Sequence, residues 1–167
     1  LDAEAIALAN KHGVWLDMDI YNGDWIEEVG TKEGWPAEYL RKNRETTHVQ
    51  RRGFAAAVKA GAKMTFGTDA AVYPYGVGGR QFSYMVRYGM TPLQAIQSAT
   101  LVAWQGLGRE DVGVVEANRW ADLIAVSGDH VYLGLRSPVL RGWAVVLELR
   151  PEVEDAGPGE LALSPFP

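Results

Sequence analysis

The spacing of apolar and polar residues changes along the first part of the chain. Residues 14–21 (VWLDMDIY) alternate between the two kinds of side chain, which predicts a β-strand, and the apolar stretch at 63–69 (KMTFGTD) predicts a second. Residues 1–12 and residues 37–60 are each predicted to form a helix that ends before a glycine. Since helices and strands alternate, the sequence predicts an α/β fold with parallel strands.

Glycine and proline mark the segments between these elements. Residues 22–35 are rich in Gly, Asp and Glu and are predicted to be a loop with at most a short helical turn. Residues 70–79 contain proline and several glycines, which predicts a second loop, and a helix is expected at 80–88. The Thr-Pro pair at 91–92 is typical of a helix start, because threonine caps free backbone N–H groups and proline fits the first turn. This helix is expected to end within the segment QGLG.

The character of the chain changes after residue 110. Short apolar runs there predict strands of a small second unit, at residues 113–115, 121–126 and 143–149. Residues 151–167 combine proline, glycine and acidic side chains without periodicity, which predicts a flexible tail. The predicted organisation is therefore a first domain at 1–110, a β unit at 111–150 and the tail.

Composition narrows the class of protein. The chain has 167 residues, of which 47% are hydrophobic and 22% charged, values that suit a globular domain with a buried core. A net charge of -5 without a basic stripe argues against a nucleic-acid partner. No apolar stretch approaches the roughly 20 residues of a membrane span, and no secretory signal is visible. The absence of cysteine excludes disulfides and thiolate sites and fits the expected cytoplasmic location.

Several motifs resemble the amidohydrolase superfamily, especially its branch of Xaa-Pro dipeptidases and imidazolonepropionase-like enzymes. The last barrel strand and final helices of that family are similar to AGAKMTFGTDAAVYPYG and QFSYMVRYGMTPLQAIQSAT. The return of such chains into their flanking β domain is similar to GVVEANRWADLIAVSGD, where Asn118 suits the left-handed turn in which relatives often have glycine. With HGVWLDMDIYN and QRRGFAAAVKAG, the likeness covers residues 1–129 in unbroken order.

The resemblance implies a fold and a place within it. Members of the family have a distorted (β/α)8 barrel of the TIM type and a small β-sandwich built from both ends of the chain. Mapped by order, residues 14–21 are the seventh strand and residues 63–69 the eighth. We therefore expect the C-terminal part of a TIM-like barrel together with part of the flanking β-sandwich.

Asp69 is the main candidate for chemistry, because it ends an apolar strand just before a glycine-rich loop. The resemblance implies that it is the metal-binding aspartate, which accepts the proton of a metal-held water and returns it to the departing amine. The alternative is that Asp69 only caps the following turn. Its position alone favours this alternative, whereas the resemblance favours the metal-binding role. His12, His48 and His130 are not paired at metal-binding spacing. Most ligands of the expected divalent metal, zinc, are therefore expected outside this chain.

Other polar residues follow or lie on the predicted strands. Tyr21, Tyr75 and Arg80 are candidate substrate contacts, and Arg80 could pair with a substrate carboxylate. The alternatives are a phenol packed over the barrel rim for Tyr21 and a surface salt bridge for Arg80. Where Tyr75 stands, related sequences often have histidine. Asp17 and Asp19 lie on the same face of the first predicted strand. They could act as an acid and base pair, or they could accept hydrogen bonds at the edge of the strand.

These observations lead to a hypothesis and two alternatives. The chain is predicted to be part of a metal-dependent amidohydrolase that cleaves an amide bond in a dipeptide or N-acyl amino acid through a metal-activated water. The alternatives are a cyclic-amide hydrolase of the imidazolonepropionase-like type and a non-catalytic fragment without a metal centre. The isolated chain is expected to be inactive. Its expected partner is the N-terminal barrel portion or another chain that supplies the first six strands, because an open barrel leaves strand edges exposed.

Overall fold

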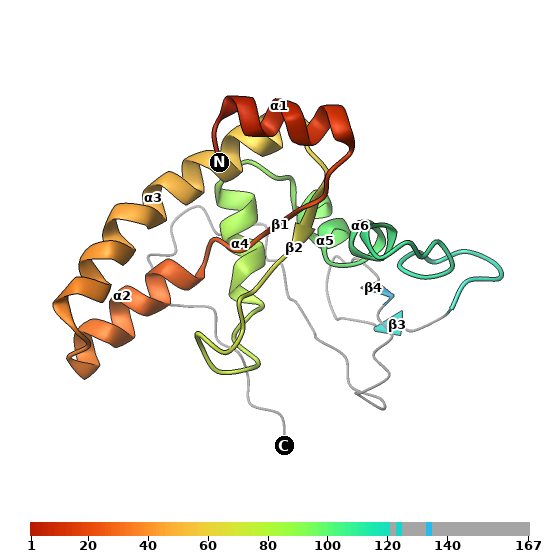
Figure 1. Cartoon of the computed structure of the whole chain (residues 1–167). Helices are drawn as coiled ribbons and strands as arrows, with labels where there is room; N and C mark the ends of the chain where they lie inside the picture. The colour runs from red at the N-terminus through yellow and green to blue at the C-terminus, as the bar shows by residue number, and fades with distance from the viewer. Residues whose placement is uncertain (121–122, 125–132, 135–167) are drawn as a thin grey trace, which may run out of the picture.

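Two short parallel strands lie side by side at the centre of the structure, a computed structural model that describes residues 1–120, 123–124 and 133–134 (Figure 1). Strand β1 (Leu16–Met18) pairs with strand β2 (Met64–Phe66) in parallel, which confirms the predicted α/β arrangement. Both strands are shorter than the predicted segments. Beyond β1, the backbone N–H groups of Ile20 and Tyr21 donate to a side chain of a later helix instead of continuing the sheet.

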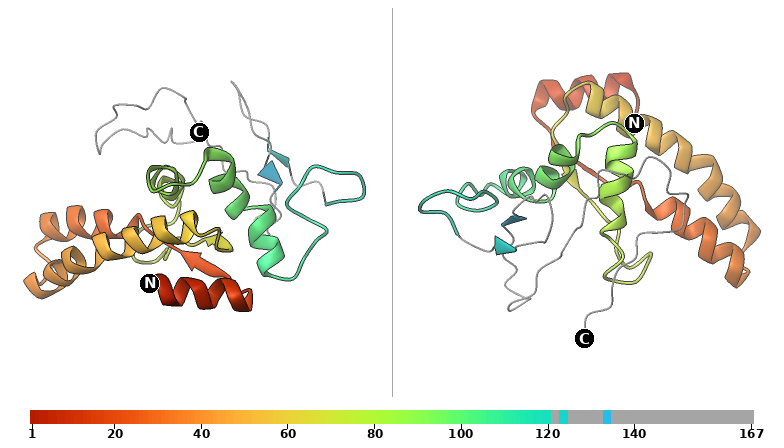
Figure 2. Two further views of the ribbon diagram at one scale, coloured as in Figure 1. Left: turned by 90° about the horizontal axis from the view of Figure 1, so that it is seen from above. Right: turned by 180° about the vertical axis from the view of Figure 1, so that it is seen from behind.

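Helices precede, connect and follow this pair of strands. Within the described residues they are α1 (Ala3–His12), α2 (Asn22–Glu33), α3 (Ala37–Lys59), α4 (Arg80–Arg87), α5 (Pro92–Ser98) and α6 (Leu101–Gly106). Helices α2 and α3 together form the connection between β1 and β2, and they run side by side in both views of Figure 2. The predicted helices at 1–12, 37–60 and 80–88 are confirmed.

The ends of these helices follow from local chemistry. The Asp2 carboxylate accepts a hydrogen bond from the N–H of Ala5 at 2.9 Å and so caps the start of α1. Helix α1 ends at Gly13 with a φ of 66°, a left-handed conformation that glycine adopts without steric cost. At the start of α5, Thr91 and Gln94 form a reciprocal capping box. The helix start predicted from the Thr-Pro pair is therefore confirmed.

The prediction of a loop at residues 22–35 is wrong, because this segment forms α2. Its glycines provide close packing against α3 and do not break the helix. A Cβ atom on Gly23 would lie 2.3 Å from the hydroxyl oxygen of Thr47, and one on Gly30 would lie 2.8 Å from a methyl group of Leu40. Both glycines are buried. Tertiary packing against α3 therefore overrides the low helix propensity of glycine.

The single helix predicted after residue 91 is interrupted between α5 and α6. Thr100 lies at the break with non-helical dihedral angles, and its hydroxyl donates to the carbonyl of Ile96 at 3.0 Å. Gly113 packs directly on the start of α6, since a Cβ atom there would lie 2.8 Å from the Cα of Leu101. That close contact fixes the break in space.

The β unit after residue 110 is described only in part. Strand β3 (Leu123–Ile124) lies within the predicted strand at 121–126 and pairs with β4 (Leu133–Gly134) in antiparallel orientation. The prediction of a strand at residues 113–115 is wrong, because residues 113 and 114 form a bend and residue 115 has no regular structure; Gly113 takes a φ of 87°. Asn118 has the expected left-handed conformation, with a φ of 65°. The predicted strand at 143–149 and the predicted tail at 151–167 lie outside the described residues.

The core forms where the strands meet α1, α3, α4 and α5. Its members are apolar and nearly or fully inaccessible to solvent: Ile6, Ile20, Phe54, Ala57, Met64, Phe82, Met85, Met90 and Ala95. Because these residues come from segments spread between α1 and α5, their burial fixes the strands relative to the helices. In the part of the chain that the structure describes, no helix is long and apolar enough to cross a membrane.

Candidate functional site at the strand ends

The carboxyl ends of β1 and β2 lie at one edge of the sheet, because the strands are parallel and paired in register. Asp19 and Asn22 follow β1, and Asp69 follows β2. The side-chain amide of Asn22 donates hydrogen bonds to the carboxylates of Asp19 and Asp69, and the bond to Asp69 Oδ2 is 3.3 Å long. Asn22 therefore connects the ends of the two strands. Asp69 itself is exposed, so its carboxylate is accessible to a ligand.

Asp19 is the more enclosed of these two carboxylates. It also accepts a hydrogen bond from Gln50 of α3, at 3.3 Å. Partial burial raises the pKa of Asp19, and the negative charges of Asp69 and Asp17 act in the same direction. Asp17 differs, because it is exposed and accepts a hydrogen bond from Thr65 on the neighbouring strand at 2.8 Å. The strand-edge role considered for this pair therefore applies to Asp17, while Asp19 belongs to the cluster around Asn22.

Tyr21 and Arg80, both predicted substrate contacts, lie together. The hydroxyl of Tyr21 accepts a hydrogen bond from Arg80 Nη1 at 3.1 Å, and the guanidinium carbon lies 5.8 Å from the centroid of the tyrosine ring. Tyr21 is buried, with 3% of its surface exposed. Arg80 has no ion pair with any other residue that the structure describes, and its Nε atom is buried without a hydrogen-bond partner. Its charge therefore remains available to a ligand.

The tyrosine that packs into the site is Tyr73, whereas the predicted Tyr75 is 84% exposed. Tyr73 is 2% exposed, and its ring meets the ring of Tyr21 edge-on at a centroid distance of 5.4 Å. Its hydroxyl is buried and interacts with the side chain of Thr68. Sequence reasoning missed Tyr73, and no local signal distinguishes the two tyrosines of YPY.

Burial raises the pKa of the Tyr73 phenol, and the negative charges of Asp19 and Asp69 raise it further. The side chain of Thr68 opposes this shift. Because the ordinary pKa of a tyrosine is 10.0, the hydroxyl keeps its proton at neutral pH. Tyr73 is therefore a hydrogen-bond donor next to two carboxylates.

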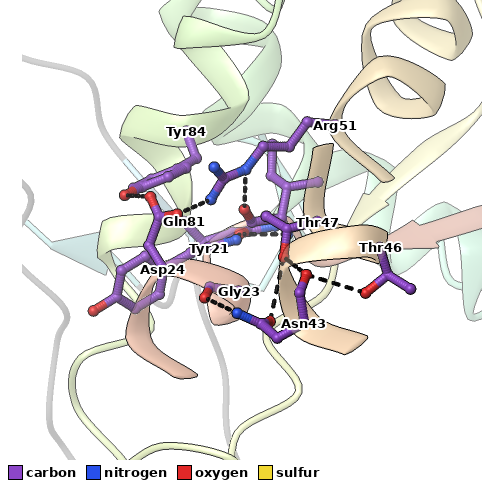
Figure 3. Close-up of polar contacts among 10 residues, drawn as sticks. Tyr21, Gly23, Asp24, Asn43, Thr46, Thr47, Arg51, Gln81 and Tyr84 are labelled. Carbon is purple, nitrogen blue, oxygen red and sulfur yellow. Dashed lines mark hydrogen bonds and ion pairs between the residues drawn. The ribbon is translucent and has the colours of Figure 1, made fainter. Parts of the chain in front are cut away.

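Gln81 holds the turn after β1 in place and was also missed from the sequence. Its side-chain oxygen accepts hydrogen bonds from the N–H groups of Ile20 and Tyr21, both at 3.0 Å, and its amide nitrogen donates to the carbonyl of Met18 at 2.8 Å. Gln81 is fully buried. Figure 3 shows its side chain next to Tyr21. A residue of α4 therefore determines where the backbone of the candidate site lies.

A second polar cluster supports the same segment from α3 and α4 (Figure 3). Arg51 forms an ion pair with Asp24 at 2.7 Å and donates to the carbonyl of Ile20 at 3.2 Å. The hydroxyl of Tyr84 donates to the carboxylate of Asp24, and the guanidinium carbon of Arg51 lies 5.0 Å from the centre of the Tyr84 ring. Burial raises the pKa of Tyr84, and its bond to Asp24 raises it further. The cluster joins the start of α2 to both neighbouring helices.

The histidines do not join this site. His12 and His48 are exposed, and His48 Nδ1 lies 3.0 Å from the carbonyl of Arg44 within α3. His130 lies outside the described residues. Among the residues that are described, no three His, Cys, Asp or Glu side chains are grouped so as to hold a metal ion. The exposed carboxylate of Asp69 could therefore provide one oxygen ligand to a metal, with further ligands supplied from elsewhere.

Comparison with known proteins identifies similar sequences and folds. A family model described as "Amidohydrolase family" matches residues 1–155. The solved structure of a Xaa-Pro dipeptidase with methionine bound in its active site is 35% identical, with a TM-score of 0.69 over 77% of this chain and 32% of that chain. A prolidase complexed with N-methylphosphonate-L-proline is 26% identical, with a TM-score of 0.67 and the same coverage.

Two further proteins show a more restricted similarity. The ochratoxinase of A. niger is 27% identical, with a TM-score of 0.54 over 67% of this chain and 25% of that chain. Adenine deaminase 2 of Agrobacterium fabrum is 50% identical over 40 residues, which are 24% of this chain and 7% of that protein. The chain spans about a third of the length of the solved dipeptidase and prolidase that it resembles.

Proposed function

The chain belongs to the amidohydrolase family, and on that premise we propose that it is the C-terminal part of a metal-dependent hydrolase that cleaves an amide bond in a dipeptide or N-acyl amino acid. The described α/β fold is similar to amidohydrolase structures over about three quarters of the chain, as expected for part of a TIM-like barrel. In this proposal β1 and β2 are the seventh and eighth barrel strands. The small unit that contains β3 and β4 belongs to a flanking β-sandwich.

The observation that carries the proposal is the position of Asp69. It follows an eighth-strand candidate, its carboxylate is exposed, and Asn22 joins it to the end of the adjacent strand. Reactive groups of barrel enzymes lie at this end of the strands. Its position and accessibility therefore fit a role in catalysis as well as the role of one metal ligand.

The reaction requires a nucleophile and a proton carrier. When bound, a divalent metal, which we expect to be zinc, would supply a water molecule activated for attack on the amide carbonyl. Asp69 accepts a proton from the attacking water on its carboxylate and delivers it to the nitrogen of the leaving amine. The hydrogen bond from Asn22 to Oδ2 restricts the orientation of that carboxylate.

Substrate recognition is assigned to the residues beside Tyr21. Arg80 supplies a cation without an ion-pair partner in the described part of the chain, and the hydroxyl of Tyr21 orients it. This arrangement suits a substrate with a free carboxylate, which dipeptides and N-acyl amino acids have. Methionine bound to one relative and a phosphonate of proline bound to another support the same substrate class. Tyr75 extends from the adjacent loop, where it would contact only the outer part of a bound substrate.

The remaining strands and metal ligands are proposed to come from the N-terminal portion of the barrel, in the same protein or in a second chain. Strands β1 and β2 pair only with each other among the described residues, so each has a free edge. A barrel sheet is stable when it closes on itself. We therefore expect a surface of more than about 2,000 Å² to be buried when this chain is completed.

The test compares Asp69→Asn with Asp17→Asn in the assembled enzyme, on dipeptides, N-acyl amino acids and cyclic amides. Asp69→Asn is expected to lower turnover by roughly a thousandfold or more, because it removes both a metal ligand and the proton carrier. Asp17→Asn is the matched control, since Asp17 also lies at the strand edge but bonds to Thr65. Near-normal turnover in Asp69→Asn would reject the assignment. Preferential hydrolysis of cyclic amides, or absence of bound metal, would favour the alternative functions.

A further inference from the structure

The two carboxylate oxygens of Asp19 both accept hydrogen bonds from side chains. Oδ2 accepts from the amide nitrogen of Asn22, and Oδ1 accepts from the amide nitrogen of Gln50 on α3 at 3.3 Å. Asp19 lies three residues before the first residue of α2, but in the described structure its carboxylate accepts no hydrogen bond from the backbone N–H groups of that helix. The carboxylate therefore holds two side chains and does not cap α2.

The amide of Asn22 joins Asp19 to Asp69. Its nitrogen carries two hydrogens and donates to both carboxylates, at 3.3 Å to Asp69 Oδ2. The amide oxygen can only accept, so an amide turned by 180° would direct an acceptor at two groups that cannot donate. Asp69 is exposed, and water competes there for its bond, whereas Asp19 is partly buried. Asp19 is therefore the acceptor that keeps the nitrogen of Asn22 directed at Asp69.

The backbone next to Asp19 is fixed from two helices. The N–H of Ile20 donates to Gln81 of α4 at 3.0 Å, and the carbonyl of Ile20 accepts from Arg51 of α3 at 3.2 Å. Gln50, which binds the Asp19 carboxylate, directly precedes Arg51 in α3. Asp19 is therefore held both through the neighbouring backbone and at its carboxylate.

We propose that Asp19 is a positioning residue, which holds the Asn22 amide so that Asp69 keeps the orientation in which it accepts and delivers the proton. In this role Asp19 touches neither the substrate nor the metal and acts through Asn22 alone. Residues that orient metal ligands in this way change metal affinity or activity by about 10–100-fold when they are replaced. The inference rests on the proposed function, because it concerns the carboxylate that carries that reaction.

Asp19→Asn and Asp17→Asn form a matched pair for steady-state kinetics of the assembled enzyme on N-acetyl-L-leucine and L-leucyl-L-alanine. Both keep the shape of the side chain, but only Asp19 bonds to Asn22, whereas Asp17 bonds to Thr65. Asp19→Asn is expected to lower kcat by about 10–100-fold with KM within about threefold, because the proposed substrate contacts are unchanged. Asp17→Asn should stay within about twofold of wild type. An unchanged kcat in Asp19→Asn, or a loss confined to KM, would overturn the inference.

A double-mutant cycle tests whether Asp19 acts through Asn22. Added to Asn22→Ala, the Asp19→Asn change should lower kcat by less than about twofold more, because the bond that it acts on is already lost. Losses that multiply would show a separate role for Asp19 and would overturn the inference. Gln50→Leu should lower kcat in the same direction but by less, since Asp19 keeps Asn22. If Asp19→Asn does not fold, an unchanged kcat in Gln50→Leu overturns the inference in its place.

NMR of the metal-free assembled enzyme, labelled with 15N-asparagine, tests the contact without activity. The side-chain NH2 signals of Asn22 are those that disappear in Asn22→Ala. Asp19→Ala and Asp69→Ala should each shift one of these two proton signals, and Asp17→Ala should shift neither, because each carboxylate accepts its own hydrogen bond from Asn22. Unmoved Asn22 signals in Asp19→Ala would overturn the inference. Shifted signals in an enzyme whose wild type hydrolyses no amide would retain Asp19 as the residue that holds Asn22 and would reject the proposed reaction.

Discussion

Replacing Gln81 by leucine should destabilise the protein locally at the candidate site. The variant leaves the N–H groups of Ile20 and Tyr21 without a partner, whereas the carbonyl of Met18 keeps the hydrogen bond from the N–H of Gly67 at 3.1 Å. Each buried group that loses its partner costs about 1–3 kcal/mol, whereas the added apolar surface of leucine returns about 2 kcal/mol. Because Gln81 is fully buried, water cannot replace the amide, and the net loss should be about 2 kcal/mol.

Urea unfolding measures this loss, and amide hydrogen exchange locates it. The N–H groups of Ile20 and Tyr21 should exchange much faster in Gln81→Leu, while those in the middle of α3 should not. Gln97→Leu is the control: Gln97 is partly buried with no side-chain hydrogen bond among the described residues, so its effect should stay within about 0.5 kcal/mol. A Gln81→Leu variant within about 1 kcal/mol of wild type, with unchanged exchange at both amides, would refute the reasoning.

Three other substitutions test separate parts of the structure. Ala71→Gly should raise the free energy of unfolding by about 1 kcal/mol in a urea titration, because Ala71 has a φ of 117° that only glycine adopts without strain. Arg51→Met should lower the free energy of unfolding by about 2–3 kcal/mol, since Asp24 loses an ion pair that is only partly exposed. Arg109→Ala should return the pKa of Asp111 from about 2 toward its ordinary 3.8, measured by NMR titration. Because that pKa is lowered in the folded state, the stabilisation is present above pH 3.8 and is lost as the pH falls toward 2.

The parts of the fold that the sequence predicted are those controlled by local signals. Alternating side chains revealed β1, and glycine after an alanine-rich segment marked the end of α1. Threonine followed by proline marked the start of α5. Asp69 was placed at a strand end by the same kind of reasoning, because a short apolar run followed by a glycine-rich loop has few other interpretations.

The remaining features depend on contacts between distant residues. From the sequence, Gln81 is expected on the surface of a polar helix. Its hydrogen bonds to residues 60 or more positions earlier in the chain account for its burial. The glycines of α2 act as spaces for side chains of α3, which single-residue propensities do not represent. The choice between Tyr73 and Tyr75 depends on the path of one strained loop, since Ala71 takes a conformation unusual for alanine.

Several contacts that shape the candidate site join described residues of this chain. Asn22 joins the two strand ends, Gln81 fixes the backbone after β1, and Arg80 contacts Tyr21. Each of these bonds forms between described residues of this chain. In the proposed enzyme, the other barrel strands contribute metal ligands and a closed sheet to an edge whose side chains are hydrogen-bonded to one another. Preorganised donors and carboxylates are more effective than flexible ones, because binding does not have to order them first.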